Sequence, residues 1–110
     1  MNTAMNLPEI ISNYINASNA HDAPAILDCF SDTATVRDEG QTLTGTKAIK
    51  GWIETTIEKY NFHFEPLRIR HDGAEIILAV RVSGTFPGSP VTLDYHFTTE
   101  SGKISSFSVK

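Results

Sequence analysis

The sequence has a single cysteine, Cys29, among its 110 residues. One cysteine cannot form an intrachain disulfide, so nothing demands an oxidising compartment. No apolar run approaches the roughly 18 residues that a membrane-spanning helix needs. The first six residues also lack the basic and apolar blocks of a secretory signal peptide. We therefore expect a cytoplasmic protein that does not bind a membrane.

Basic residues are also few. The chain has 9 Lys and Arg residues against 13 Asp and Glu residues, which leaves a formal net charge of -4. The basic residues are scattered singly and form no stripe that could neutralise phosphates. We therefore expect no nucleic-acid partner.

The common motifs for metal and nucleotide chemistry are missing from the sequence. The four histidines, His21, His63, His71 and His96, form no H-x-x-x-H pattern, and none pairs with the cysteine at ligand spacing. There is no G-x-S-x-G, no P-loop and no dinucleotide-binding fingerprint. We therefore expect neither a metal ion nor a cofactor.

What the sequence does contain is the composition of one globular domain. Hydrophobic residues make up 40% of the chain and charged residues 20%, which is typical of a folded rather than a disordered chain. A chain of 110 residues can bury one core and is too short for two. We expect a single domain over residues 1–110.

The spacing of apolar residues predicts helices first and strands afterwards. Three helices are expected, over about 7–19 with Asn6 as a candidate cap, from the N-cap Asp22, and after Gly45-Thr46. Residues 31–33 are of types common in turns. Residues 34–38 alternate between apolar and polar as a strand does, and residues 41–44 are expected to form a short strand that runs back beside it. Four further strands are expected over 62–71, 75–86, 91–99 and 103–110, joined by hairpin turns. This order predicts an α+β fold with an antiparallel meander.

Asp38 stands out because it continues an apolar row. Strand side chains alternate between faces, so Ala34, Val36 and Asp38 share one face. An ionised carboxylate buried there without a partner would cost several kcal/mol, so its pKa should rise or it should lie at a cavity mouth. Such a group is a candidate general base. The alternative is that Asp38 ends the strand and caps the following turn at Glu39-Gly40.

Two tyrosines fall on inward-facing positions. Tyr14 lies among the apolar positions of the first helix, and Tyr95 shares its strand face with Val91, Leu93 and Phe97. Each phenol can bring a hydroxyl group into the interior, where buried Tyr hydroxyls usually find a partner. An ordinary core role is the alternative for both.

Three stretches of the chain resemble the NTF2-like superfamily. They are Asn13-Tyr14 with Asn19-Ala20-His21-Asp22, the F-x-D-x-A-x-V-x-D pattern of residues 30–38, and the T-G-x-x-A-I pattern of residues 44–49. Within the superfamily the chain is most similar to ketosteroid isomerase and the SnoaL-like polyketide cyclases. The resemblance covers nearly the whole chain. It implies a cone-shaped, cystatin-like fold, in which three helices pack on a strongly curved, mostly antiparallel sheet around a deep apolar pocket.

The resemblance also implies roles for particular residues. Ketosteroid isomerase uses an Asp base beside a Tyr and a protonated Asp that bind an oxyanion. Here Tyr14 matches the oxyanion tyrosine and Asp38 matches the base. The isomerases carry an acidic residue directly before His-Phe in the penultimate strand, whereas this chain has Tyr95 there. A tyrosine can donate a hydrogen bond as a protonated carboxyl group does, but the difference argues against steroid isomerisation specifically.

The resulting expectation is a small enzyme that removes a proton alpha to the carbonyl group of an apolar compound, as an isomerase or a cyclase. Asp38, Tyr14 and Tyr95 would be catalytic. Five side chains would line the pocket and contact substrate: Trp52, Ile53, Phe64, Phe86 and Phe107. The alternative is a non-catalytic domain that binds a small hydrophobic ligand or serves as a dimerisation module. In either case we expect a homodimer formed through the outer face of the sheet.

Overall fold

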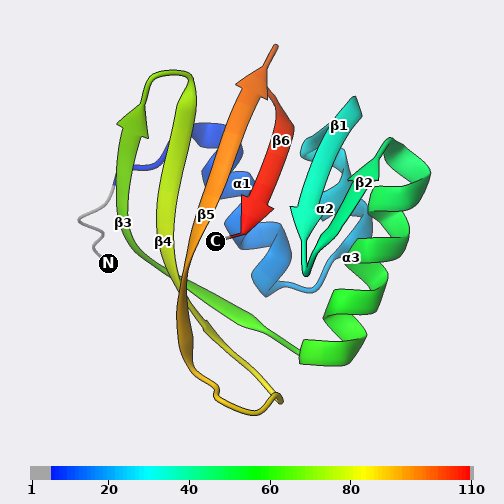
Figure 1. Ribbon diagram of the computed structural model, residues 1–110, viewed down its shortest axis with the longest axis vertical. Coiled ribbons are helices and arrows are strands. Elements are labelled where there is room, and N and C mark those ends of the chain that lie inside the picture. Colours follow the sequence, from blue (N-terminus) through cyan, green and yellow to red (C-terminus); the bar gives the residue numbers. More distant parts are fainter. Residues whose placement is uncertain (1–5, 110) are drawn as a thin grey trace.

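The computed structural model describes residues 6–109, and this part of the chain contains helices and strands in the α+β order expected (Figure 1). In chain order the elements are α1 (Glu9–Asn19), α2 (Ala23–Asp28), β1 (Phe30–Asp38), β2 (Gln41–Thr44), α3 (Thr46–Tyr60), β3 (His63–Asp72), β4 (Glu75–Ser83), β5 (Val91–Glu100) and β6 (Lys103–Val109). No helix in residues 6–109 is both long and apolar enough to cross a membrane.

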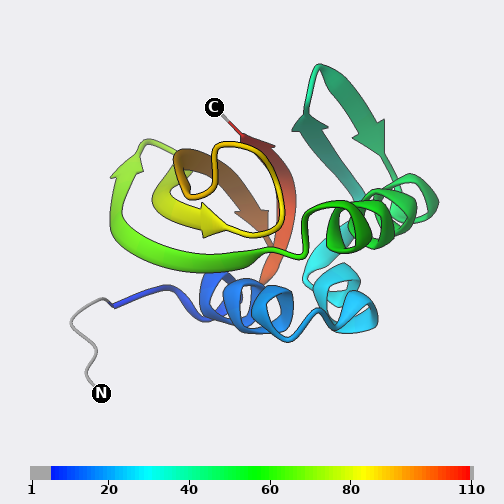
Figure 2. The same ribbon diagram turned by 90° about the horizontal axis from the view of Figure 1, so that it is seen from below.

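The six strands form one sheet in the order β2-β1-β6-β5-β4-β3. Strands β1 and β6 pair in parallel, and the other neighbouring strands pair antiparallel. Figure 1 shows α1 and α2 behind the sheet, and Figure 2 shows how strongly strands β3 to β5 curl around. The expected curved, mostly antiparallel sheet with three helices is confirmed.

The helix starts agree with the sequence in one case and differ in another. Asp22 caps α2 as expected, because its Oδ1 accepts a hydrogen bond of 3.2 Å from the backbone N–H of Ala25. The expectation that Asn6 caps the first helix is wrong. Pro8 occupies the N-cap of α1 and the helix begins at Glu9, with no side-chain cap. Proline is well tolerated there because its missing N–H would have no partner within the helix.

Two strand boundaries also correct the expectation. Residues 31–33, expected as a turn, belong to β1, which begins at Phe30 because that residue pairs with Ile104 of β6. The register between β1 and β6 shifts before Thr35, so the turn-prone residues form an irregular stretch within the strand. Strand β4 ends at Ser83, three residues earlier than expected. The expected last residue of the final strand, Lys110, lies outside the described residues.

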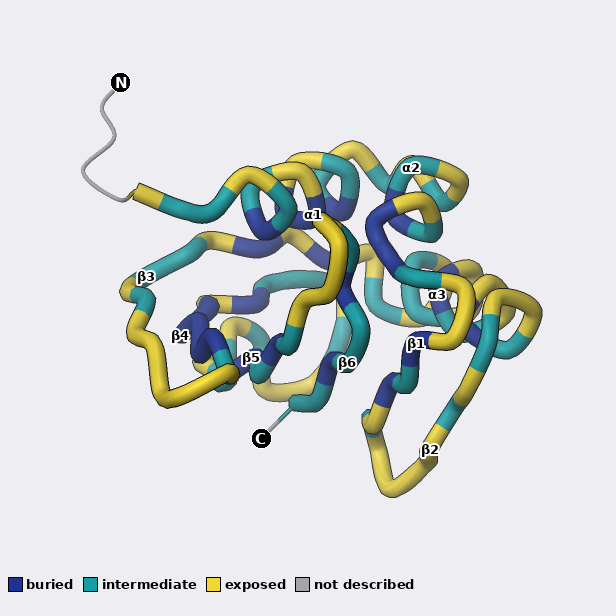
Figure 3. The backbone as a smooth tube through the Cα atoms, turned by 90° about the horizontal axis from the view of Figure 1, so that it is seen from above, coloured by how far each residue is buried: buried dark blue, intermediate teal, exposed yellow. Residues whose placement is uncertain are grey.

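Burial follows the predicted alternation on β1 and β5. It does not on β4, where Ile77 and Ala79, expected on the outer face, are buried like the residues on either side of them. Ala34 and Val36 are fully buried, and Phe97 is fully buried on β5. The dark blue segments in Figure 3 show that α1, β4 and β6 bury residues toward the interior. The outer face of the sheet is polar around His96 of β5, whose Nδ1 lies 3.0 Å from Glu75. Dimerisation through this face stays a prediction.

Candidate active site

A cavity of about 230 Å³ lies between the helices and the curved sheet. Its walls come from all three helices, from strands β1 and β3 to β6, and from the segment after β4. All eight side chains expected at a site line this one cavity: Tyr14, Asp38, Trp52, Ile53, Phe64, Phe86, Tyr95 and Phe107. The fold therefore brings together residues that lie up to 93 positions apart in the chain.

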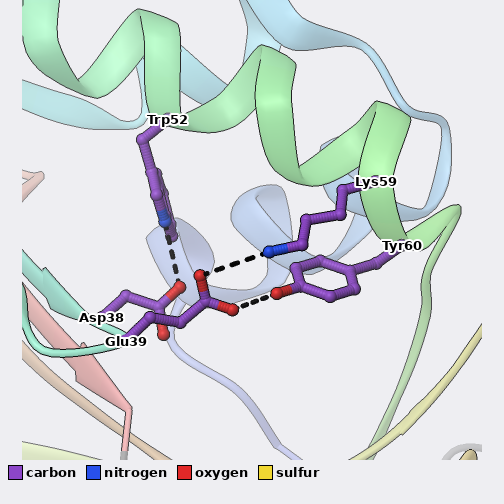
Figure 4. A network of polar contacts seen from close by, with 5 residues as sticks. All are labelled: Asp38, Glu39, Trp52, Lys59 and Tyr60. Carbon is purple, nitrogen blue, oxygen red and sulfur yellow. Dashed lines mark hydrogen bonds and ion pairs between the residues drawn. The ribbon is translucent and has the colours of Figure 1, made fainter. Parts of the chain in front are cut away.

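Asp38 is the last residue of β1 and its side chain is half-buried at the cavity. The Trp52 indole N–H of α3 donates a hydrogen bond of 3.0 Å to Oδ2 of Asp38 (Figure 4). Burial raises the pKa of the Asp38 carboxyl group, and the bond from Trp52 opposes that rise. Asp38 therefore both ends its strand, as the alternative interpretation held, and presents its carboxylate to the cavity.

The role of Trp52 as a hydrogen-bond donor was not expected from the sequence, which indicated only a lining residue. The two partners are 14 residues apart and lie on different elements. An indole N–H beside an apolar wall usually has a partner when buried. A carboxylate on the same cavity is the partner here, and it is thereby held in a defined orientation.

Tyr14 and Tyr95 reach the cavity from opposite layers, Tyr14 from α1 and Tyr95 from β5. Both residues are buried, at 3% and 4% exposure. Burial raises the pKa of both phenols well above the usual value, and the Ser18 hydroxyl beside Tyr14 opposes the rise there. Both phenols are therefore neutral O–H donors across the physiological pH range.

The ring of Phe107 on β6 packs against three of the side chains at the cavity. Its centroid lies 5.7 Å from Tyr14, 5.0 Å from Tyr95 and 5.7 Å from Trp52. These distances fall within the range of favourable aromatic pairs. Phe107 thus fixes the relative positions of both phenols and of the indole that holds Asp38.

Glu39 and Tyr60 are lining residues that sequence reasoning missed. Glu39 and Gly40 form the two-residue turn between β1 and β2, both with positive φ (52° and 77°). This conformation is typical of type I′ hairpins and is uncommon for a glutamate. Glu39 accepts a hydrogen bond from the Tyr60 hydroxyl, and its other oxygen lies 3.9 Å from Nζ of Lys59 (Figure 4). The sequence located the turn at Glu39-Gly40, but nothing in it indicated that Glu39 contacts Tyr60 at the cavity.

The described residues include no group of three or more His, Cys, Asp or Glu side chains placed to hold a metal ion. The polar groups at the cavity are carboxylates, hydroxyls and one indole N–H, and most of the remaining lining residues are apolar. This combination can accept a proton at Asp38 and can stabilise negative charge on a nearby oxygen through the two phenols.

Comparison with known proteins identifies the family. The model of the SnoaL-like domain matches residues 11–107 of this chain. The chain belongs to the SnoaL-like domain family. No curated protein sequence matches this SnoaL-like domain, whereas many solved structures do.

Three solved structures illustrate the similarity. A candidate polyketide cyclase from Sinorhizobium meliloti is 36% identical, with a TM-score of 0.90, covering 94% of this SnoaL-like domain and 95% of that protein. SalBIII, an epoxide hydrolase/cyclase-like enzyme of pyran ring formation in salinomycin, is 25% identical (TM-score 0.79, coverage 92% and 86%). A protein of ketosteroid isomerase-like fold from Catenulispora acidiphila, solved with trimethylamine, shares the fold at 22% identity (TM-score 0.82, coverage 96% and 86%). The expected NTF2-like fold and the SnoaL-like resemblance are confirmed.

Proposed function

We propose that this SnoaL-like domain is an enzyme that removes a proton from the carbon next to a carbonyl group in a small apolar compound. The observation that supports this most strongly is the shared cavity: the carboxylate of Asp38 and the buried, neutral phenols of Tyr14 and Tyr95 line the same apolar space. These are the three groups that enolisation needs, namely a base and donors to the oxygen on which charge develops.

In the proposed step, one oxygen of Asp38 takes the proton from the α-carbon. The electron pair of the broken C–H bond forms the C=C bond of an enolate, and the carbonyl π electrons move onto oxygen. Tyr14 and Tyr95 donate hydrogen bonds to that oxygen. In a β,γ-unsaturated ketone, return of the proton from Asp38 to the γ-carbon completes an isomerisation. Alternatively, the enolate carbon attacks a second carbonyl carbon of the same molecule and closes a ring; the π electrons of that carbonyl move onto its oxygen, which takes the proton back from Asp38.

The electrostatics of the cavity suit this assignment. Burial raises the pKa of Asp38 and so makes the carboxylate a stronger base, while the Trp52 hydrogen bond limits the rise. A positioned base typically contributes about 10²–10⁴-fold and one oxyanion donor about 10²–10³-fold. The neutral phenols carry no charge that would have to be displaced when substrate binds.

The names of two relatives favour ring-forming chemistry. The Sinorhizobium meliloti protein bears the name of a candidate polyketide cyclase, and SalBIII acts in the formation of a pyran ring. The cavity adds a limit on size. At about 230 Å³ it is smaller than the roughly 300–1,000 Å³ typical of pockets for drug-sized ligands. A one- or two-ring ketone fits this space better than a steroid does.

Hydrogen–deuterium exchange tests the proposed step without knowledge of the natural substrate. α-Tetralone, a two-ring ketone with acidic hydrogens at one carbon, is incubated with the protein in D₂O and followed by NMR. The wild type should accelerate exchange at that carbon, and Asp38→Asn should reduce the acceleration by at least about 10²-fold because the base is lost. Glu54→Gln, a change at an exposed carboxylate of α3 that does not line the cavity, is the matched control.

Exchange that survives in Asp38→Asn would exclude Asp38 as the base. A second candidate function, binding of a small hydrophobic ligand without chemistry, is supported by the predominance of apolar side chains at the cavity. Binding of α-tetralone to the wild type with no exchange above the buffer rate would favour this second function.

A further inference from the structure

Ser18 is a polar residue in the buried interior that the proposed reaction does not use. It lies on α1 and lines the cavity, and it is only 1% exposed. Its Oγ is buried and has no hydrogen-bond partner at normal geometry among the described residues. A hydroxyl group left in this state destabilises a folded protein, so its presence at a cavity needs an explanation.

The usual solution for a serine within a helix is not taken. Such a hydroxyl normally bonds to the backbone carbonyl three or four residues earlier. Thr56 of α3, which lines the same cavity, does this through a hydrogen bond of 3.0 Å to the carbonyl of Ile53. Ser18 makes no such bond to the helix backbone.

The position of Ser18 relative to Tyr14 indicates what it could bind. The two residues are four positions apart on α1 and therefore lie one above the other on the same helix face. The Ser18 hydroxyl lies beside the phenol and lowers its pKa as a hydrogen-bond donor to the phenol oxygen does, although no hydrogen bond of normal geometry joins the two side chains. Two hydroxyl groups from one helix thus line neighbouring parts of the cavity wall, and both can donate to an oxygen atom of a ligand.

We propose that Ser18 is a specificity-determining residue that donates a hydrogen bond to an oxygen atom of the bound compound, next to the oxygen-binding phenol of Tyr14. The proposal rests on the proposed function only in that the cavity must hold a ligand, and it does not require proton transfer. It predicts that the cavity discriminates between a ketone and the hydrocarbon of the same shape, and that Ser18 contributes to this discrimination.

The test compares α-tetralone with tetralin, which has the same two rings and no oxygen, by isothermal titration calorimetry. The wild type should bind the ketone more tightly than the hydrocarbon. Ser18→Ala should weaken ketone binding about 2- to 12-fold, the range for one neutral hydrogen bond, and should leave tetralin binding unchanged. Ser31→Ala is the matched control, since Ser31 of β1 also has a buried, unpartnered hydroxyl but does not line the cavity.

Two further measurements separate this role from a structural one. Ser18→Ala removes an unpaired buried hydroxyl and places a good helix former in α1, so its Tm should be at least that of the wild type. In a Tyr14→Phe background, Ser18→Ala should still weaken ketone binding, because Ser18 contacts the ligand itself. Loss of the effect in that background would mean that Ser18 acts only through Tyr14 and would overturn the proposal.

A wild type that shows no preference for the ketone, or that binds neither compound, would also overturn it. The exchange experiment and the binding experiment can fail separately. A wild type that catalyses no exchange but loses ketone affinity on Ser18→Ala refutes the proposed reaction and supports Ser18. A wild type that catalyses exchange, together with a Ser18→Ala variant of unchanged ketone affinity, supports the proposed reaction and refutes the role proposed for Ser18.

Discussion

The hydrogen bond from Trp52 to Asp38 can be removed with little other change by the substitution Trp52→Phe. The bond is 3.0 Å long, and Phe keeps an aromatic ring against Phe107 but has no N–H to donate. The donor stabilises the ionised form of Asp38, so its loss should raise the pKa of this carboxyl group further. The acid limb of the pH profile for α-tetralone exchange should therefore move to higher pH.

The size of the shift follows from the strength of such bonds. A hydrogen bond to a charged group contributes about 1.5–3 kcal/mol when well buried. Asp38 is half-buried, so water replaces part of the lost bond and about 0.7–1.4 kcal/mol is a better figure. At 1.36 kcal/mol for each tenfold change in the protonation equilibrium, the acid limb should move by about 0.5–1 pH unit.

The assay is kcat/KM for exchange measured across the pH range, because this parameter reports the titration of the free enzyme. Leu93→Val is the control: it alters the apolar wall of the same cavity but removes no hydrogen bond to Asp38. It should change KM and leave the acid limb where it is. An acid limb that stays fixed or moves to lower pH in Trp52→Phe would refute the assigned role of the indole.

Two stability predictions follow from other features. Because burial raises the folded-state pKa of Asp38, its ionisation weakens folding: this cost is absent below the unfolded pKa and grows as pH rises through the folded pKa. Asp38→Asn should therefore be more stable than the wild type in urea at pH 7 and equal to it near pH 3; equal stability at both pH values would contradict this. Gly84→Ala should destabilise by about 1–3 kcal/mol, since a Cβ there would lie 2.3 Å from the backbone oxygen of Tyr60. The control Gly51→Ala, where a Cβ in α3 would meet open space, should stabilise the fold by about 0.5–1 kcal/mol. Urea denaturation measures the free energy of unfolding of both variants. A Gly84→Ala variant more stable than the wild type would contradict the predicted clash with Tyr60.

Local patterns in the sequence predicted the helices and most of the strands because the spacing of apolar residues depends on neighbours three or two positions apart. They failed where distant pairing decides the outcome. Residues 31–33 look like a turn, yet Phe30 pairs with Ile104 of β6, and this contact draws them into β1. The same limit applied at the start of α1, where Pro8 rather than Asn6 precedes the helix.

The candidate site shows the same division. Alternation alone placed Asp38 on an apolar face, and the match at Tyr14 supplied a reason to connect the two residues. Two contacts at the site join residues far apart in the chain, so local spacing could not predict them. They are the hydrogen bond from Trp52 to Asp38 and the one from Tyr60 to Glu39. No spacing in the sequence marks Ser18 as a residue of the cavity wall. Its lack of a partner is a property of three-dimensional packing.

Trp52 is the only tryptophan in the chain, and it lies on the cavity wall with its N–H bonded to the proposed base. Its ultraviolet emission therefore comes from one place in the molecule. A ligand that enters the cavity displaces solvent from the indole and should shift the emission wavelength. Protonation of Asp38 changes the charge next to the ring and should alter its intensity. The protein thus contains an intrinsic optical reporter of both occupancy and ionisation at the site, and no label needs to be added.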